Sequence, residues 1–184
     1  MDGMEPVEIT AGRLHLRPFG PQDVPAVTRA CQDPDIQNFT QVPSPYHAEE
    51  ARRYVEVHCP SGWATGRRAS FAVVDSVSGD LLASVELNGI GIRDAAMAEI
   101  GYWCAPWARR RGVMTQAVQV VCRWGFVAFD LARIEWYAEV GNVASRGVAE
   151  KAGFTVEGVL RARLTHRGER VDAWVGSLLR AEAV

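Results

Sequence analysis

Three arginines and a glycine stand directly before the clearest helical pattern in this 184-residue chain. Arg109, Arg110 and Arg111 follow a segment typical of a strand, and Gly112 leads into a helix expected to begin near Thr115. The first N–H groups of a helix have no partner within it, and the helix dipole adds positive potential at that end, so helix N-termini bind anions. Gly112 has no Cβ and lets a ligand approach the backbone closely. The pattern indicates a phosphate or pyrophosphate site.

The net charge of the chain and the spacing of its glycines bear on other interpretations of the three arginines. A solvated surface patch explains three loop arginines as well as an anion site does. Nucleic-acid binding is less favoured, because the formal net charge is −2 and the rest of the chain is not basic. The chain contains neither G-x-x-x-x-G-K-[ST] nor G-x-G-x-x-G, which excludes a P-loop and a Rossmann dinucleotide site.

The elements that must position this turn follow from hydrophobic periodicity. Residues 98–103 and 133–140 predict strands, and residues 115–129 between them predict a helix whose polar stripe is narrow. A strand–helix–strand unit of this kind is expected to form a parallel pair with a right-handed crossover. The turn therefore lies at the end of one central strand.

The other segments predict a single mixed α/β (α+β) domain spanning residues 1–184. Further strands are expected at 13–17, 70–75, 81–87, 156–164 and 170–179, further helices at 22–31, 47–58 and 144–152, and loops at 32–46 and 61–68. The result is a mostly antiparallel sheet of seven strands flanked by about four helices.

Composition excludes several classes of protein. Hydrophobic residues make up 48% and charged residues 23% of the chain, as in ordinary globular domains. The N-terminus lacks a signal-peptide pattern, and no apolar run approaches the roughly 20 residues of a membrane span. The four cysteines are scattered, which favours free thiols over a zinc site or disulfides. We expect a cytoplasmic protein without metal, membrane or nucleic-acid partner.

The turn resembles a known family signature. Residues 109–114 are similar to [Q/R]-x-x-G-x-[G/A], the pyrophosphate signature of the GNAT acetyltransferases, with Met114 at a position where glycine or alanine is usual. The strand Glu99–Trp103 before it resembles that of the RimJ/RimL-like branch, which acetylates N-termini of ribosomal proteins. Further segments resemble the second signature (N-x-A-S…E-K-x-G-F), the opening strand and the closing hairpin of that branch: Asn142–Ser145, Glu150–Phe154, Arg13–Phe19 and Gly168–Arg180.

The resemblance implies a GNAT fold with acetyl-CoA as co-substrate. In this family the strand before the signature and the strand after the helix splay apart, and the pantetheine arm lies in the gap. The residues implied to contact the cofactor are Ile100, Gly101, Tyr102 and Trp103 along the arm, Arg109, Arg110, Arg111, Gly112, Val113, Met114 and Thr115 around the pyrophosphate, and Asn142 and Ser145 at the sulfur end.

The resemblance also implies direct attack of a neutral amine on the thioester. Glu99 is our first candidate for the base, acting through water, and Glu135 and Glu139 are alternatives. Many relatives use a tyrosine to protonate the thiolate, but Ala149 stands at that position here, so Ser145 is the candidate acid. A serine there can equally be a helix cap, and Glu99 can equally form a surface ion pair.

The acceptor pocket is expected from the first two helices, the loops at 32–46 and 61–68, and the last hairpin. Trp63 and Tyr46 either cover the substrate or pack into the core. His166 is expected to be solvated at the hairpin tip, and Asp172 either fixes the hairpin or meets the amine. A peptide N-terminus, a small amine, an aminoglycoside-like antibiotic and a lysine side chain remain open as acceptors.

Three classes of function follow. The leading hypothesis is an active N-acetyltransferase, with another donor such as succinyl-CoA also open. The second is a non-catalytic acyl-CoA-binding sensor or interaction protein on the same fold. The third is a nucleic-acid-binding domain that uses the arginines. A homodimer is suggested by the resemblance alone.

Overall fold

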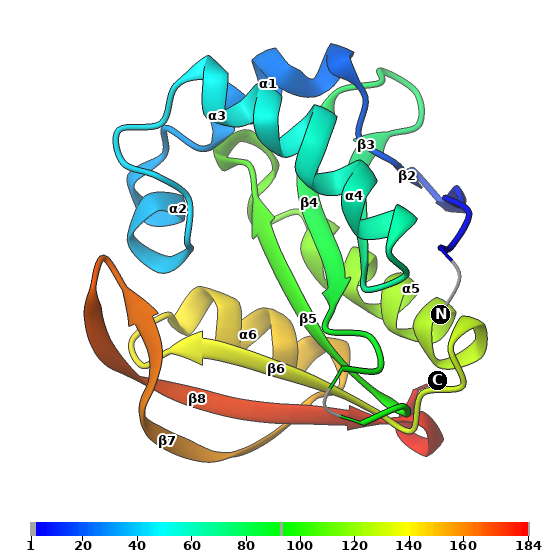
Figure 1. Ribbon diagram of the computed structural model, residues 1–184, viewed down its shortest axis with the longest axis vertical. Helices are drawn as coiled ribbons and strands as arrows, with labels where there is room; N and C mark the ends of the chain where they lie inside the picture. The colour runs from blue at the N-terminus through cyan, green and yellow to red at the C-terminus, as the bar shows by residue number, and fades with distance from the viewer. Residues whose placement is uncertain (1–2, 93, 184) are drawn as a thin grey trace.

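The computed structural model describes residues 3–92 and 94–183, and these contain one continuous sheet (Figure 1). The strand order is β1-β2-β3-β4-β5-β6-β8-β7. The strands are β1 (Ile9–Ala11), β2 (Leu14–Arg17), β3 (Arg68–Asp75), β4 (Leu81–Asn88), β5 (Met97–Cys104), β6 (Arg133–Glu139), β7 (Thr155–His166) and β8 (Glu169–Leu179). All neighbouring pairs are antiparallel except β5 with β6.

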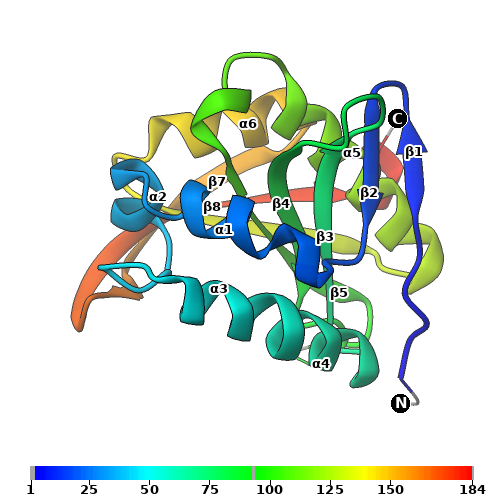
Figure 2. The same ribbon diagram turned by 90° about the horizontal axis from the view of Figure 1, so that it is seen from above.

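Helices cover both faces of this sheet (Figure 2). The α-helices are α1 (Val24–Ala30), α2 (Pro34–Phe39), α3 (Ala48–Arg53), α4 (Cys59–Ala64), α5 (Val113–Ala128) and α6 (Val143–Ala152). One face packs against α5 and α6, and the opposite face carries α1, α3 and α4 over β3 and β4. A single π-helical turn, Tyr54–His58, joins α3 to α4. No helix among the described residues is long and apolar enough to cross a membrane.

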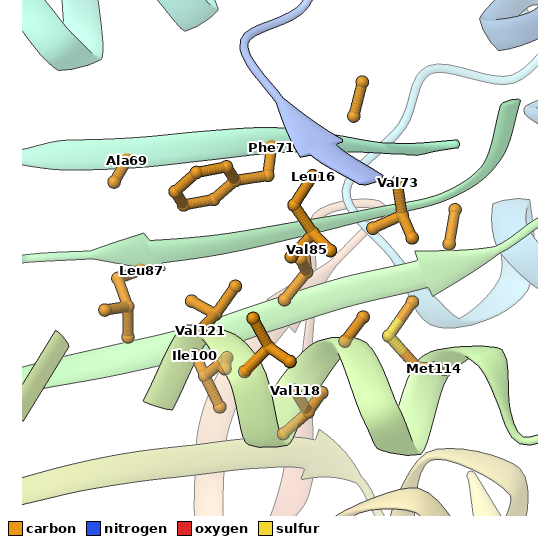
Figure 3. Close-up of a cluster of buried hydrophobic side chains, with 14 of the residues drawn as sticks. Leu16, Ala69, Phe71, Val73, Val85, Leu87, Ile100, Met114, Val118 and Val121 are labelled. Atoms are coloured by element: carbon orange, nitrogen blue, oxygen red, sulfur yellow. The ribbon is translucent and has the colours of Figure 1, made fainter. Parts of the chain in front are cut away.

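The hydrophobic core lies between the sheet and α5 (Figure 3). Alternate residues of the central strands, such as Val85, Leu87 and Ile100, point to this helix and are almost fully buried. Val118 and Val121 of α5 meet them at the spacing of one helix face. The core therefore fixes the start of α5 relative to the end of β5.

The expected fold class is confirmed, but three details of the prediction are wrong. The sheet has eight strands rather than seven, because residues 9–11 pair with β2. The expected loop at 32–46 contains α2, which begins at Pro34 after the N-cap Asp33, whose side chain accepts from the amides of Asp35 and Ile36. The expected loop at 61–68 begins inside α4.

The parallel pair is incomplete, and this creates the gap at the centre of the molecule. β5 and β6 pair from Met97 with Arg133 up to Ile100 with Trp136. The last four residues of β5 pair only with β4, and the last three residues of β6 pair only with β8. Between the two diverging ends, main-chain N–H and C=O groups of each strand lack a strand partner.

Close packing of α5 against β4 leads to a stability prediction. A Cβ at Gly125 would lie 2.4 Å from a terminal methyl of Leu87, whereas a Cβ at Gly147 in α6 meets nothing within 4 Å. We expect Gly125→Val to lower the free energy of unfolding by about 1–3 kcal/mol through overpacking. Gly147→Val should change it by less than about 0.5 kcal/mol. Denaturant unfolding of both variants checks this, and equal stabilities would contradict it.

Candidate functional site

A cavity of about 760 Å³ occupies the mouth of the gap between the ends of β5 and β6. We call it the large cavity. Its walls are the end of β5, the arginine turn, the first turns of α5 and α6, and helix α2. Ten of the residues expected to contact the cofactor line it: Tyr102, Trp103, Arg109, Arg110, Gly112, Val113, Met114, Thr115, Asn142 and Ser145.

Three of the expected cofactor residues lie outside this lining. Ile100 is 1% exposed and packs in the core against α5 (Figure 3). Gly101 has the space of its missing side chain on the opposite face of the sheet, toward Glu86 and Asn88. Arg111 is exposed on the turn.

The turn before α5 has the conformation of an anion-binding loop. Gly112 is the N-cap of α5 and adopts a left-handed conformation with φ of +74°, and Arg110 is also left-handed with φ of +60°. A Cβ at Gly112 would meet no protein atom within 4 Å, so the space above the backbone is open. The structure gives Arg110 and Arg111 no ion pair with any residue it describes. Free helix amides and two exposed guanidinium groups thus face the same region.

Met114 was the departure from the family signature, and its side chain does not obstruct this loop. It is 4% exposed and points from α5 into the core (Figure 3). The long side chain is therefore accommodated by packing rather than by the anion site. Its main-chain N–H remains one of the unpaired groups of the first helical turn.

Arg109 forms a half-buried link to α2. Its guanidinium donates two hydrogen bonds to Asp33, one of them 3.3 Å long to Oδ2, and a further one of 3.2 Å to Asp35. Burial opposes ionisation of Asp33, but Arg109 and the amides of Ile36 and Asp35 outweigh it and hold the pKa of this carboxyl below its usual value. The arginine turn is thereby tied to the N-terminus of α2.

The other end of α2 is tied to the last hairpin. The Arg167 guanidinium donates to the carbonyl of Gln37 at 2.9 Å, and Gln41 Nε2 donates to the carbonyl of Thr165 at 2.6 Å. Figure 1 shows α2 between the upper part of the sheet and this hairpin. Helix α2 therefore bridges the two diverging arms of the sheet, and Ile36 and Phe39 line the large cavity between them.

A hydrogen-bond network surrounds Ser145 at the inner end of the large cavity. The indole N–H of Trp136 donates to Ser145 Oγ at 3.1 Å, and this hydroxyl donates to the phenol oxygen of Tyr102 at 3.3 Å. Tyr102 in turn donates to the carbonyl of Ser145 at 2.9 Å. Burial raises the pKa of Tyr102 well above its usual value, so the phenol stays protonated. The hydroxyl of Ser145 is held from β5 and β6 at once.

Ser145 is not the cap of its helix, which corrects that alternative. α6 begins at Val143 with Asn142 as N-cap, and the Asn142 side-chain oxygen accepts from the main-chain N–H of Ser145 at 3.1 Å. Ser145 therefore lies inside the first turn, and its hydroxyl is available to the network with Trp136 and Tyr102. Ala149 is buried, as expected for a position without the tyrosine of other relatives.

The acidic candidates lie on the opposite face of the sheet from Ser145. Glu99 and its register partner Glu135 line a separate cavity of about 180 Å³ together with Asn88. Glu135 accepts from Arg133 and from the phenol of Tyr137. These carboxylates are thus placed beside the paired part of β5 and β6 rather than in the large cavity.

Several residues expected near the acceptor have structural contacts. Trp63 is 3% exposed and donates to the carbonyl of Ser70, so it covers the edge of β3, and Tyr46 is also buried. His166 was expected to be solvated, but its side chain is only 18% exposed and it pairs with Glu139 at 3.2 Å. Asp172 accepts from the N–H of Ala162 and fixes a left-handed residue of the hairpin.

Some residues of the site were not predicted from the sequence. Trp136 was not singled out, because its hydrogen bond to Ser145 has no local signal in the sequence. Lys151 lines the large cavity although only its place in the second signature was noted. The contribution of α2 was missed although Asp33 followed by Pro34 is a recognisable helix start. No group of three or more His, Cys, Asp or Glu side chains suited to a metal ion occurs within residues 3–92 and 94–183.

The fold agrees with the comparisons to known proteins. Residues 13–155 match the model of the acetyltransferase (GNAT) domain. The chain belongs to the GNAT acetyltransferase family and is an N-acetyltransferase by that membership. The resemblance seen in the sequence is thereby confirmed, and the diverging strands and the loop before α5 lie within the matched residues.

Individual relatives cover nearly the whole chain. The uncharacterized N-acetyltransferase p20 of Bacillus licheniformis is 25% identical over 92% of this chain and 94% of its own length. A structure of RimL, described as a ribosomal L7/L12 alpha-N-protein acetyltransferase in complex with coenzyme A, superimposes with a TM-score of 0.81 at 22% identity, covering 95% of this chain and 98% of that one. Spermidine N-acetyltransferase from Vibrio cholerae gives 0.76 at 21% identity, covering 94% and 99%. At these identities the two structures show the same fold.

The link between Arg109 and α2 leads to a prediction about dynamics. Asp33→Asn keeps a good helix cap but loses the charge that faces Arg109. We expect main-chain amides of residues 35–41 to exchange hydrogen about tenfold faster, because a charge-assisted hydrogen bond contributes about 1.5 kcal/mol. Asp35→Asn is the matched control, since the Asp35 side chain is 69% exposed and its pair should contribute little. Equal exchange in the two variants would show that Asp33 does not hold the helix.

Proposed function

We propose that this chain transfers an acetyl group from acetyl-CoA to a primary amine by direct attack. One observation carries the proposal: a turn with free helix amides and positive charge at the start of α5 opens into the same cavity as the unpaired main chain of β5. Pyrophosphate on the amides around Gly112, with pantetheine amides along residues 101–104, would satisfy both sets of groups. The cavity of about 760 Å³ has the size of a cofactor site.

Three groups near the gap have roles in the proposed reaction. An unpaired N–H of β5 beyond Ile100 stabilises the oxyanion that forms on the thioester carbonyl. Ser145 donates its proton to the leaving sulfur: Trp136 occupies the acceptor side of its hydroxyl, and the O–H turns from its long 3.3 Å hydrogen bond to Tyr102 toward the sulfur. Glu99 remains a candidate base that acts through water.

The relatives indicate only the chemical class of the acceptor, which is an amine. The names of RimL and of spermidine N-acetyltransferase describe a protein N-terminus and a polyamine. For this chain we propose a peptide N-terminus first, because RimL superimposes more closely than spermidine N-acetyltransferase does, with TM-scores of 0.81 and 0.76. A polyamine is the second candidate. Succinyl-CoA as donor and a binding protein without turnover are the alternatives that the assays below separate.

Cofactor binding is tested by blocking the turn. Wild type should bind acetyl-CoA in the micromolar range, about −8 kcal/mol, by calorimetry. Gly112→Glu places a like charge and a side chain where phosphate is expected and should abolish most of this binding. Gly79→Glu is the control, since Gly79 is also left-handed and open but lies in the β3–β4 turn. If wild type failed to bind acetyl-CoA or succinyl-CoA at millimolar concentration, the function would be rejected.

The role of Ser145 is tested by turnover. Release of free thiol from acetyl-CoA is followed with a hexapeptide bearing a free N-terminal alanine and, separately, with spermidine. Ser145→Ala should lower kcat by about 100-fold while the Kd for acetyl-CoA stays the same. Trp136→Phe leaves the Ser145 hydroxyl in place but removes the indole N–H that donates to it, so kcat should fall by a smaller factor than in Ser145→Ala. Acetyl-CoA binding without thiol release from any amine would instead support the non-catalytic alternative.

A further inference from the structure

A row of three residues crosses the sheet on the face opposite α5. Ser70 of β3 is the register partner of Glu86 in β4, and Glu86 is the register partner of Gly101 in β5. Gly101 is the first residue of β5 beyond the last pair with β6, Ile100 with Trp136. The row therefore ends at the point where the two central strands part.

Neither backbone conformation nor crowding requires a glycine at 101. Gly101 is not among the glycines with a left-handed conformation. A Cβ built on it would lie 3.7 Å from Glu86 Cγ, 3.8 Å from Asn88 Nδ2 and 3.9 Å from Glu86 Oε1, which are ordinary van der Waals distances. A methyl group at this position would fit in contact with Glu86 and Asn88, so the glycine leaves room of that size beside the Glu86 carboxylate.

The carboxylate beside this space is held but not saturated. Ser70 Oγ donates to Glu86 Oε2 at 3.0 Å, and Arg68 Nε lies 3.7 Å from Oε1. Within the described residues, Oε1 accepts no hydrogen bond, and it is the oxygen nearer to the space over Gly101. The Glu86 side chain is 22% exposed, so its orientation is set by these contacts and not by bulk solvent. A donor that enters beside Gly101 would meet a preoriented acceptor.

The two faces of β5 offer different chemistry at the point of divergence. On the α5 face, Ile100 fills the core and Tyr102 contacts Ser145. On the other face lie Glu86 and the space over Gly101. The thioester is proposed to lie along β5, between Ser145 on one face and Glu86 on the other. Ser145 can therefore donate a proton to the sulfur while Glu86 accepts one from the nitrogen.

We propose that the space over Gly101 holds the acceptor amine and that Glu86, rather than Glu99, is the carboxylate that binds it and takes its proton. This inference rests on the proposed function. As the nitrogen attacks, the C–N bond forms and the C–S bond breaks. The proton lost by nitrogen passes to Glu86 and then to water, and the sulfur leaves as a thiol with the proton donated from Ser145, which water restores. The ligand class is a primary amine whose nitrogen enters as N–H donor toward Oε1.

The proposal is tested with Glu86→Gln, Gly101→Val and Glu86→Asp. Glu86→Gln keeps the shape and the acceptor for Ser70 but removes the charge, and Gly101→Val fills the space on a strand that tolerates a β-branched residue. Glu56→Gln is the matched control, because Glu56 is exposed on the π-helical turn, away from β5. Thiol release is measured at saturating acetyl-CoA with the alanine hexapeptide and with spermidine, and the Kd for acetyl-CoA is measured by calorimetry.

We expect Glu86→Gln and Gly101→Val to lower kcat/KM for the amine at least 100-fold, with the Kd for acetyl-CoA changed less than threefold. Glu86→Asp should recover part of the loss, and Glu56→Gln should match wild type. Glu86→Gln with more than a third of wild-type kcat/KM would overturn the proposal and leave the function standing. Loss of acetyl-CoA binding in Glu86→Gln would also overturn it, because the role would then be structural. Wild type that binds acetyl-CoA but releases no thiol with either amine would reject the function itself, and the proposal with it.

Discussion

The parting of β5 from β6 after Ile100 and Trp136 is the constraint on which the molecule depends. Main-chain groups inside a protein must find hydrogen-bond partners, and a sheet that opens in its middle leaves two rows of them unmatched. The chain keeps the opening in shape from two sides: Tyr102 reaches Ser145 at its inner end, and α2 joins Arg109 to the hairpin at its mouth. An extended ligand with its own amides can complete the pairing in the manner of an added strand.

Much of this fold follows from periodicity. The central strands and α5 carry long hydrophobic patterns whose period is enough to specify the element. Their bounds fall within a few residues of those expected. β1 was missed because three residues give no alternation to detect. α4 was missed because Pro60 and Gly62 within it are typical of loops, and Trp63 holds the segment by packing at the edge of β3. In such places tertiary contacts override local preference.

The site was predictable where its parts are adjacent in sequence. The turn around Gly112 combines helix start, positive charge and a special conformation within a few residues. The partner of Arg109 is 76 residues away, and the contact between Tyr102 and Ser145 spans 43. Long-range contacts of this kind arise from topology and leave no local pattern, which is why Trp136 and Glu86 were not singled out.

The strand order has a consequence for synthesis on the ribosome. Beyond Trp136, β6 is paired only with β8, which follows β7 in the chain and inserts between β6 and β7. The N-terminal elements can fold as they emerge, because β1 to β4 pair in sequence order. The second arm of the opening cannot form until residues 173–175, which pair with the end of β6, have been translated. A nascent chain therefore cannot hold the opening in shape until β8 has left the ribosome.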